Sequence, residues 1–412
     1  MIAKLRSLRR YSYTVPWCVP AWGLEEFGAT VVSLATGRVR SGPSVDRFTA
    51  EVRAFLGVRY AIPVNRGRTA ITIALRAMGI GRDDDVVVPS YVCQSVLDGV
   101  LSAGATPVFA DVDATLNVTA DTVARALTPT TRAVIVAHLF GTPAPIDEIE
   151  RLLEPRRIAL IDDAAQALGV RRAGRLVGTF GQCGIVSCGP GKPLAGAAGG
   201  MLVTNDEKLY VAAASLPLPS EPARQIAGRT IGFWVWRRLR RYTLPLRVLV
   251  SRLAGEPYEL PHRGARLANL DAAIASVQLA RLDQHAAERR AHVQILLGLL
   301  SRLPGQGIGD LSPNSAMVKL VWLLPLGGPT VAEVVDVLAH HGIEAQHGYV
   351  PIHIGHVDDA RFPMTVGLWR RVLCVPLETR PTSSAPIDLG VLARGADDGT
   401  GGSPRANRAG VG

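Results

Sequence analysis

The chain has 412 residues, of which 48% are hydrophobic and 19% are charged. A chain of this size buries enough apolar surface for one large domain with a smaller companion domain, so we expect a stable globular protein. It has no run of about 18 uncharged apolar residues, and its basic first residues lack the apolar stretch of a secretory signal. These features argue against a membrane-spanning protein and predict a cytoplasmic location.

The net charge of +10 raises the question of a polyanionic partner, because clustered basic residues attract nucleic acids and anionic lipids. Composition alone does not establish such a partner, and we do not expect nucleic acid to be one. The five cysteines are odd in number and scattered, with no close pair at metal-ligand spacing. Neither a disulfide framework nor a metal site is therefore expected.

Lysine is rare in this chain. Of the 45 basic residues only Lys4, Lys192, Lys208 and Lys319 are lysines. Lys4 lies in the polar N-terminal stretch and Lys208 in an acidic NDEK turn, whereas Lys192 lies in SCGPGKPLAGAAGG, a nearly uncharged, glycine-rich segment. An amine in that segment has no evident solvation role, so it is a candidate for chemistry.

Helices and strands are expected to alternate from about residue 45 to 206. Apolar residues at helical spacing predict helices over 45–58, 68–80, 93–105, 119–130 and 146–156. Short apolar runs predict strands over 84–90, 106–112, 132–141, 157–169, 183–188 and 199–206. This order predicts an α/β fold whose mostly parallel sheet is covered on both faces, with the functional site beyond the carboxyl ends of the strands.

The character of the sequence changes after this region. We expect an N-terminal arm (1–39), a large domain (40–210), an irregular basic aromatic insert (211–262), a connecting helix with a small C-terminal α+β domain (263–395), and a disordered tail (396–412). The connecting helix is expected as one long amphipathic segment over 270–303. The tail is rich in Gly, Ser, Pro and charge, which is typical of disorder.

Two candidate groups follow strands of the large domain. Asp162 and Asp163 end the run RIALIDD, where a carboxylate can keep a heterocyclic nitrogen protonated, although two adjacent acids also cap helices. Lys192 follows the run GIVSC, and a lysine shielded from water forms Schiff bases readily, although lysines in flexible loops are common.

A third candidate lies near the start of the large domain. The segment PVNRGRTAITIAL is a strand end, a glycine turn and a helix start, a geometry in which free N–H groups bind phosphate. Arg68 and Thr69 add side-chain donors there, and Ser187 offers a hydroxyl five residues before Lys192. Each element alone is weak evidence, but the three together indicate a pyridoxal phosphate (PLP) site.

Over residues 40–380 the chain resembles the DegT/StrS family of PLP-dependent sugar aminotransferases. The order of several segments carries the resemblance: SGPSVDRFTAEVRAFLGVRYAIPVNRGRTAITIAL, DDVVVPSYVCQSVLDGVLSAGATPVFADVD, TRAVIVAHLFGTPAPIDEI, RIALIDDAAQALGV, GIVSCGPGKPLAGAAGGMLVTND and ANLDAAIASVQLARLDQHAAERR. The resemblance implies a fold type I enzyme with a seven-stranded type of sheet. It also implies a homodimer with active sites at the subunit interface.

The resemblance assigns roles to individual positions. Lys192 matches the lysine that holds the cofactor as a Schiff base and shuttles protons. Asp163 matches the carboxylate that pairs with the pyridine nitrogen, and Gln166 matches the residue that contacts the phenolic oxygen. The remaining matches, to ligands of the cofactor phosphate, are Ser187 and the turn of Gly67, Arg68 and Thr69.

Several positions depart from the family pattern. Arg68 stands where a small hydroxyl residue is usual, and its guanidinium is expected to bind the phosphate or to reach the substrate. Cys93 occupies the position of the aromatic residue that usually stacks on the cofactor ring, with Tyr91 as a possible substitute. Gly264 replaces the asparagine that reaches the phosphate of the neighbouring subunit, with Arg266 at the arginine position, and Gly189 replaces an asparagine in the lysine loop.

The insert has no counterpart in the resemblance. Residues 229–252 contain seven arginines, Trp234 and Trp236, and no acidic residue. This pattern suits an anionic membrane surface or a diphosphate-bearing substrate. It also suits a solvated arm that covers the dimer partner, with its aromatic residues packed down and its arginines facing outward.

These expectations combine into one predicted reaction. An amino donor, glutamate or glutamine, charges the cofactor, which then aminates a keto group of a nucleotide-activated sugar or related cyclitol. One alternative is a PLP-dependent sugar dehydratase, although such enzymes replace the lysine with histidine. The other is a non-catalytic homologue that binds membrane or nucleic acid through its insert.

Overall fold

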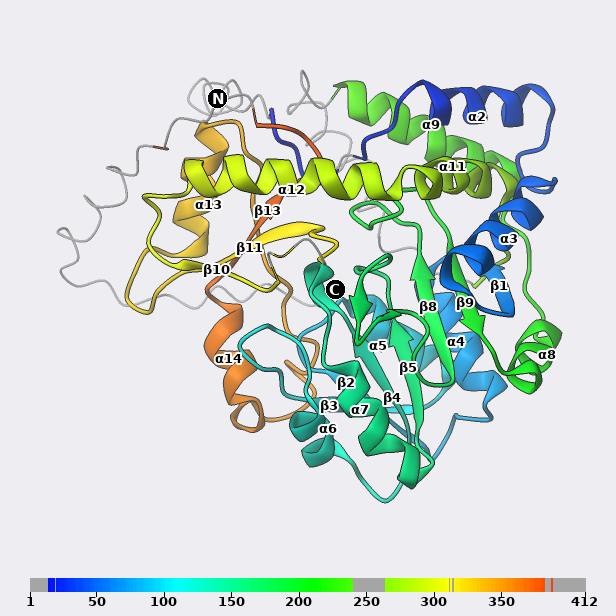
Figure 1. Ribbon diagram of the computed structural model, residues 1–412, viewed down its shortest axis with the longest axis horizontal. Coiled ribbons are helices and arrows are strands. Elements are labelled where there is room, and N and C mark those ends of the chain that lie inside the picture. Colours follow the sequence, from blue (N-terminus) through cyan, green and yellow to red (C-terminus); the bar gives the residue numbers. More distant parts are fainter. Residues whose placement is uncertain are drawn as a thin grey trace.

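A computed structural model describes residues 14–18, 20–239, 264–310, 312, 315–381 and 387. Its centre is a seven-stranded sheet with the strand order β1-β9-β8-β5-β4-β2-β3 (Figure 1). The strands all run parallel except β9, which is antiparallel to both of its neighbours. They are β1 (Tyr60–Val64), β2 (Asp85–Pro89), β3 (Thr106–Ala110), β4 (Thr131–Ala137), β5 (Ala159–Asp163), β8 (Cys183–Ser187) and β9 (Gly200–Thr204). The expected α/β fold is confirmed.

Helices cover both faces of this sheet. Ile62, Ile185 and Leu202 belong to the apolar core that α4 shares, whereas Met201 and Val203 belong to a second core with α3 and α11. Successive strand residues face opposite sides, so neighbours on β9 enter different cores. The helices of this domain are α3 (Ser44–Leu56), α4 (Gly67–Ala77), α5 (Gln94–Ala103), α6 (Ala120–Ala126), α7 (Ile146–Leu153), α8 (Glu207–Ser215) and α11 (Asn269–Ala280), with the 3-10 turns η1 (Leu139–Gly141) and η2 (Glu154–Arg156).

The smaller part of the chain is built on a four-stranded antiparallel sheet of order β10-β11-β13-β12. The long helix expected over 270–303 is two helices, because the backbone leaves helical geometry at Arg281, and the second of them crosses the top of the molecule in Figure 1. The elements are α12 (Leu282–Leu299), β10 (Gln306–Ile308), β11 (Lys319–Leu323), α13 (Val331–His340), β12 (Gln346–His347), η3 (Asp359–Arg361), α14 (Pro363–Trp369) and β13 (Val372–Pro376), besides a hairpin of β6 (Arg171–Arg172) and β7 (Arg175–Leu176).

Two helices flank α11 at the edge of the molecule (Figure 1). The N-terminal arm contains α2 (Leu24–Ala35), and the insert contains α9 (Ala223–Leu239), so the expectation of an irregular insert is wrong over this range. Trp234 of α9 packs against Trp22 and Phe27, with ring centroids 5.2 and 5.6 Å away, and its indole donates to Thr30. Trp234 thus packs inward against its own chain, whereas the cover of a dimer partner by the insert stays a prediction.

Much of the insert and the tail lies outside the described residues, including positions 240–252, which carry most of the arginines. Among the helices that are described, none combines the length and the apolar character needed to cross a membrane. The membrane-contact hypothesis for 229–252 therefore stays a prediction.

Candidate active site

The two acids at the end of β5 have different environments. Asp162 is fully buried, and its Oδ2 accepts from the backbone N–H groups of Gly178 (2.6 Å) and Phe180 (3.0 Å). Its Oδ1 lies 2.8 Å from His138 Nε2, while His138 Nδ1 accepts from the N–H of Ala144, so the ring proton lies on Nε2 and is donated to Asp162. Asp162 therefore has a structural role, holding the loop before β8 against β4.

Asp163 faces the other side of the strand. It is buried, and its Oδ1 accepts from the N–H of Ala165 at 3.0 Å. Burial raises the pKa of this carboxyl, while the charge of Lys192 acts in the opposite direction. A buried carboxyl with few partners and a nearby amine is suited to receive a positively charged group.

Lys192 follows β8 in a tight loop. A methyl group placed on Gly189 would lie 3.9 Å from Lys192 Cγ and 3.9 Å from Ser187 Oγ. Gly191 has φ +71° and a Cβ there would lie 2.8 Å from Cys18 Sγ, so the N-terminal arm covers this loop closely. The glycines thus bring the lysine stem and the serine hydroxyl to one place, as the sequence predicts.

The phosphate turn lies opposite the same serine. Helix α4 begins at Gly67, after Arg66 in extended geometry, so the first N–H groups of the helix have no partner within the helix. A Cβ on Gly67 would lie 3.3 Å from Ser187 Cβ and 3.5 Å from its Oγ. This close approach leaves a cradle of backbone N–H groups and one hydroxyl, which suits a phosphate.

The side chains of Arg68 and Thr69 are engaged elsewhere. Arg68 donates to Asp98 Oδ2 and to Ser95 Oγ, both at 2.9 Å, and both acceptors belong to α5. Thr69 is buried and donates to Asn65 Oδ1 at 2.8 Å. Their expected contribution to phosphate binding is thereby confined to their backbone N–H groups at the helix start.

Gln166 is buried within an aromatic wall that sequence reasoning did not identify. Its Oε1 accepts from the N–H of Phe140 at 3.1 Å, and its Nε2 lies 3.4 Å from the Tyr349 hydroxyl. Phe140 and Tyr349 stack with ring centroids 5.6 Å apart. Within the described residues the remaining amide hydrogen of Gln166 has no acceptor, so it can donate to a ligand. In the sequence, the only feature that could have pointed to Tyr349 is that it is the aromatic residue of the segment HGYVP.

Cys93 and Tyr91 both lie close to Tyr349. Cys93 is half-buried and caps the start of α5, whereas Tyr91 is fully buried and its hydroxyl accepts from the N–H of Tyr349 at 3.0 Å. Tyr91 therefore fixes the loop after β12 and is not free to replace the missing aromatic residue. Tyr349 is close enough to Cys93 for the thiol charge to raise the tyrosine pKa, after the larger effect of burial.

Gly264 lies against the phosphate turn of its own chain. A Cβ at this position would come within 3.0 Å of the Thr69 methyl group. Arg266 is exposed, and its Nε donates to the carbonyl of Leu218 at 3.2 Å. Because residue 264 is a glycine, it offers no side chain that could contact the cofactor phosphate.

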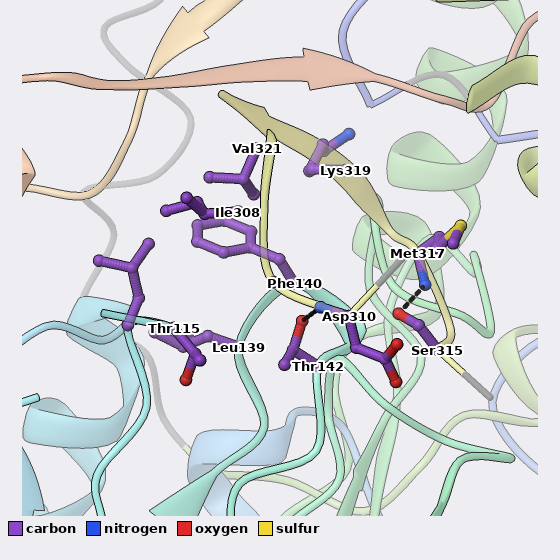
Figure 2. Close-up of a pocket in the computed structure, with 12 residues that line it drawn as sticks. Thr115, Leu139, Phe140, Thr142, Ile308, Asp310, Ser315, Met317, Lys319 and Val321 are labelled. Atoms are coloured by element: carbon purple, nitrogen blue, oxygen red, sulfur yellow. Dashed lines mark hydrogen bonds between the residues drawn. The ribbon is translucent and has the colours of Figure 1, made fainter. Parts of the chain in front are cut away.

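A small hollow lies between η1 and the small sheet. Figure 2 shows its apolar side chains, Phe140, Ile308 and Val321, facing one another while Lys319 points away from them. Neither Lys192 nor Asp163 lines it. The hollow is a seam between the two parts of the chain and not the reaction centre.

The converging residues fit PLP. Gly67, Ser187 and the start of α4 would hold its phosphate, Asp163 its ring nitrogen and Gln166 its phenolic oxygen, with Lys192 beside them. Within the described residues no group of three or more His, Cys, Asp or Glu side chains could hold a metal ion. The arrangement suits amine chemistry supported by a buried acid.

Known proteins share this arrangement of the chain. The model of the DegT/DnrJ/EryC1/StrS aminotransferase family matches residues 23–385. The spore coat polysaccharide biosynthesis protein SpsC of Bacillus subtilis (strain 168) is 27% identical over 386 residues, covering 90% of this chain and 94% of SpsC.

Solved structures of an aminotransferase and of a dehydratase have a similar fold. The aminotransferase TlmJ from Streptoalloteichus hindustanus has a TM-score of 0.69 and 27% identity, covering 88% of this chain and 93% of TlmJ. A GDP-4-keto-6-deoxymannose-3-dehydratase, ColD, shares the fold with a TM-score of 0.68 at 21% identity, covering 88% of this chain and 95% of ColD. With the family model spanning most of its length, the chain belongs to the DegT/DnrJ/EryC1/StrS family and is a PLP-dependent aminotransferase.

Proposed function

We propose that this aminotransferase moves the amino group of glutamate or glutamine to a keto group on a nucleotide-activated sugar or related cyclitol. The observation that carries the proposal is the convergence of Lys192, Asp163 and the Gly67–Ser187 cradle within one chain. The similarity to SpsC, whose name places it in polysaccharide biosynthesis, supports a sugar acceptor.

Each residue has one physical task in this reaction. When bound, PLP supplies an electron sink and a carrier for the amino group. Lys192 Nζ removes the proton from the amino-bearing carbon of the donor, and in the second half returns a proton to the former keto carbon of the acceptor. Asp163 keeps a proton at the ring nitrogen, and Gln166 orients the ring through its free amide hydrogen.

The dehydratase alternative conflicts with Lys192, because those relatives carry histidine at this position. The non-catalytic alternative requires a decayed site. The Asp163 carboxyl is buried beside an amine, and that burial carries a free-energy cost that a chain without the cofactor has no reason to keep. We therefore favour the aminotransferase reaction over both.

We further propose that the enzyme is a homodimer with shared active sites. Two observations support this: the phosphate cradle receives no side chain from Arg68 or Gly264, and α2 exposes apolar residues on its outer face. Both are consistent with a second copy that completes the site and covers the helix.

The test of the reaction is the visible absorbance of the purified holoenzyme before and after addition of L-glutamate. We expect a visible band that shifts to shorter wavelength with glutamate, because the amino group has moved to the cofactor. Lys192→Ala should abolish both the band and the shift, with activity at least about 10²-fold lower.

The matched control is Lys208→Ala, since Lys208 is an exposed lysine remote from the site. This variant should retain the band and the shift. A wild-type protein that takes up PLP but does not respond to glutamate or glutamine would refute the proposed donors, and one that takes up no PLP would refute the reaction itself.

A further inference from the structure

A second hollow lies behind the loop that carries Lys192. It is bounded by that loop, by α11 and α12, and by the residues that follow β13. We call it the Arg289 pocket. The charged residues and histidines of its lining are Lys192, His285, Glu288, Arg289, His292 and Glu378.

Two donors of this pocket are buried without an acceptor. Arg289 is 7% exposed; its Nε donates to the carbonyl of Ala316 at 3.1 Å, but its Nη2 has no hydrogen-bond partner in the described part of the chain. His285 is 4% exposed and its Nε2 likewise has none there. Buried polar groups are nearly always hydrogen-bonded, so both point to a missing acceptor.

The buried charges do not balance either. Glu378 accepts from Lys319 Nζ at 2.7 Å through Oε1 and from the N–H of Leu377 at 3.1 Å through Oε2, so each of its oxygens has a partner other than Arg289. Lys319 and Glu378 form a buried ion pair, and no described carboxylate forms a second one with Arg289. Burial, only partly offset by Glu378, lowers the pKa of Arg289 to about 10.

Two histidines lie beside Arg289 in the lining. Burial, and then the charge of Arg281, lowers the pKa of His285, so its imidazole is neutral at physiological pH. His292 Nδ1 lies 2.7 Å from the carbonyl of Leu377 and therefore donates to it. Glu288 also lines the pocket; its Oε1 accepts from Gln284 at 2.8 Å, and within the described residues it forms no ion pair with Arg289. The pocket thus combines a guanidinium whose Nη2 has no acceptor there with a neutral imidazole.

We propose that the Arg289 pocket binds one small anion of the carboxylate class between Arg289 and His285. The flat guanidinium matches a carboxylate in shape and charge, and the imidazole adds a single further donor. Resting on the proposed function, the amino donor and its keto-acid product are natural sources, because both carry carboxylates and Lys192 forms one wall. A free small anion is the other source of the same chemistry.

The test uses dialysed holoenzyme, thermal unfolding and isothermal titration calorimetry with sodium formate, sodium glutarate and sodium chloride. Glutarate resembles the donor but has no amino group to transfer. We expect a saturable rise of the wild-type Tm. In Arg289→Met the affinity should fall at least about 30-fold, because a charged partner of a buried anion is lost. Arg290→Met, the next residue on α12 and outside the pocket lining, should behave as the wild type does.

The comparison without added anion separates a binding role from a structural one. Arg289→Met should then unfold at a higher temperature than wild type, because an unpaired buried charge has been removed, and added formate should reverse the order. Arg289→Lys should bind with intermediate affinity. A response to formate and glutarate together assigns the pocket to free anions, and a response to glutarate alone assigns it to the donor.

If no anion raises the wild-type Tm above that of Arg289→Met, or if Arg289→Met is destabilised equally at every anion concentration, the proposal is wrong. The cofactor absorbance of the same preparations is recorded separately. A protein that binds formate but shows no glutamate response would refute the proposed donor reaction and leave the anion pocket standing.

Discussion

At the scale of single residues, the contrast between Asp162 and Asp163 shows how one strand separates structure from chemistry. Asp162 has its charge matched by two N–H groups and a histidine, whereas Asp163 has one N–H group and a raised pKa. The first carboxylate stabilises the loop it holds. Burial of the Asp163 carboxylate costs free energy until a cationic ring nitrogen binds beside it.

Asp163→Asn should therefore stabilise the apoprotein at pH 7 while lowering aminotransferase activity by at least about 10²-fold. The direction in which the stability changes with pH follows from proton linkage. Because the pKa of Asp163 is raised on folding, the folded wild type binds the proton more tightly than the unfolded chain does, so its stability falls as pH rises through the raised pKa. The Tm advantage of Asp163→Asn should shrink as the pH is lowered from 7 toward 5.

Asp162→Asn is the matched control, and it should lower the Tm of the apoprotein, since it weakens the contacts to Gly178, Phe180 and His138. Thermal unfolding of cofactor-free protein across this pH range measures both variants. An apoprotein Tm that falls in Asp163→Asn at pH 7 would contradict the idea that this carboxyl is held under strain.

At the scale of elements, the start of α4 decides how tightly the cofactor phosphate is held. A methyl group at Gly67 would come within 3.3 Å of Ser187 and would fill the cradle. Gly67→Ala should weaken PLP binding by about 10-fold or more, as expected for the loss of one or two charge-assisted hydrogen bonds. Fluorescence titration of the apoprotein with PLP measures this affinity.

Gly298→Ala provides the control for this substitution, because Gly298 is exposed within α12 with nothing within 4 Å of its Cβ position. It should leave PLP affinity unchanged and slightly stabilise the helix. Equal PLP affinity in Gly67→Ala and wild type would mean that the phosphate binds elsewhere.

The insert connects to this same turn through a chain of polar contacts. Arg229 of α9 donates to Glu221 at 3.0 Å and to the buried Asp271 of α11 at 2.6 Å, and Glu221 in turn accepts from Asn65 at 2.8 Å. Asn65 also accepts from Thr69 within the phosphate turn. At least this part of the insert therefore supports the active site, whatever its other arginines contact.

At the scale of the whole molecule, the sequence predicts the sheet and the centre of the site because both follow from local patterns. Apolar strands end in Asp163 and Ser187, and lysine is so rare that Lys192 stands out. The hydrogen bond from Arg68 to Asp98 could not be predicted from the sequence, since it depends on how α4 packs against α5. Tyr349 reaches Gln166 from a position 183 residues further along the chain, and no local pattern marks that contact.

The orientation of helix α2 is a further feature that local sequence patterns do not predict. Its polar residues Glu26, Thr30 and Ser33 face inward, where Gln278 of α11 donates to Glu26 at 2.7 Å. Its apolar residues face outward, with Leu24 88%, Phe27 53% and Val32 62% exposed. A helix inverted in this way needs a partner surface, because exposed apolar patches of this kind mark interfaces.

The proposed homodimer supplies that partner. Replacing both Leu24 and Val32 with Glu should weaken the dimer at least about 100-fold, because each charge would be buried in an apolar interface. Sedimentation velocity across a range of concentrations measures the dissociation. Leu101→Glu, the same change at a 51% exposed residue of α5, should leave the dimer intact. A wild-type protein that is monomeric at micromolar concentration but floats with anionic vesicles would instead assign the outer face of α2 and α9 to a membrane.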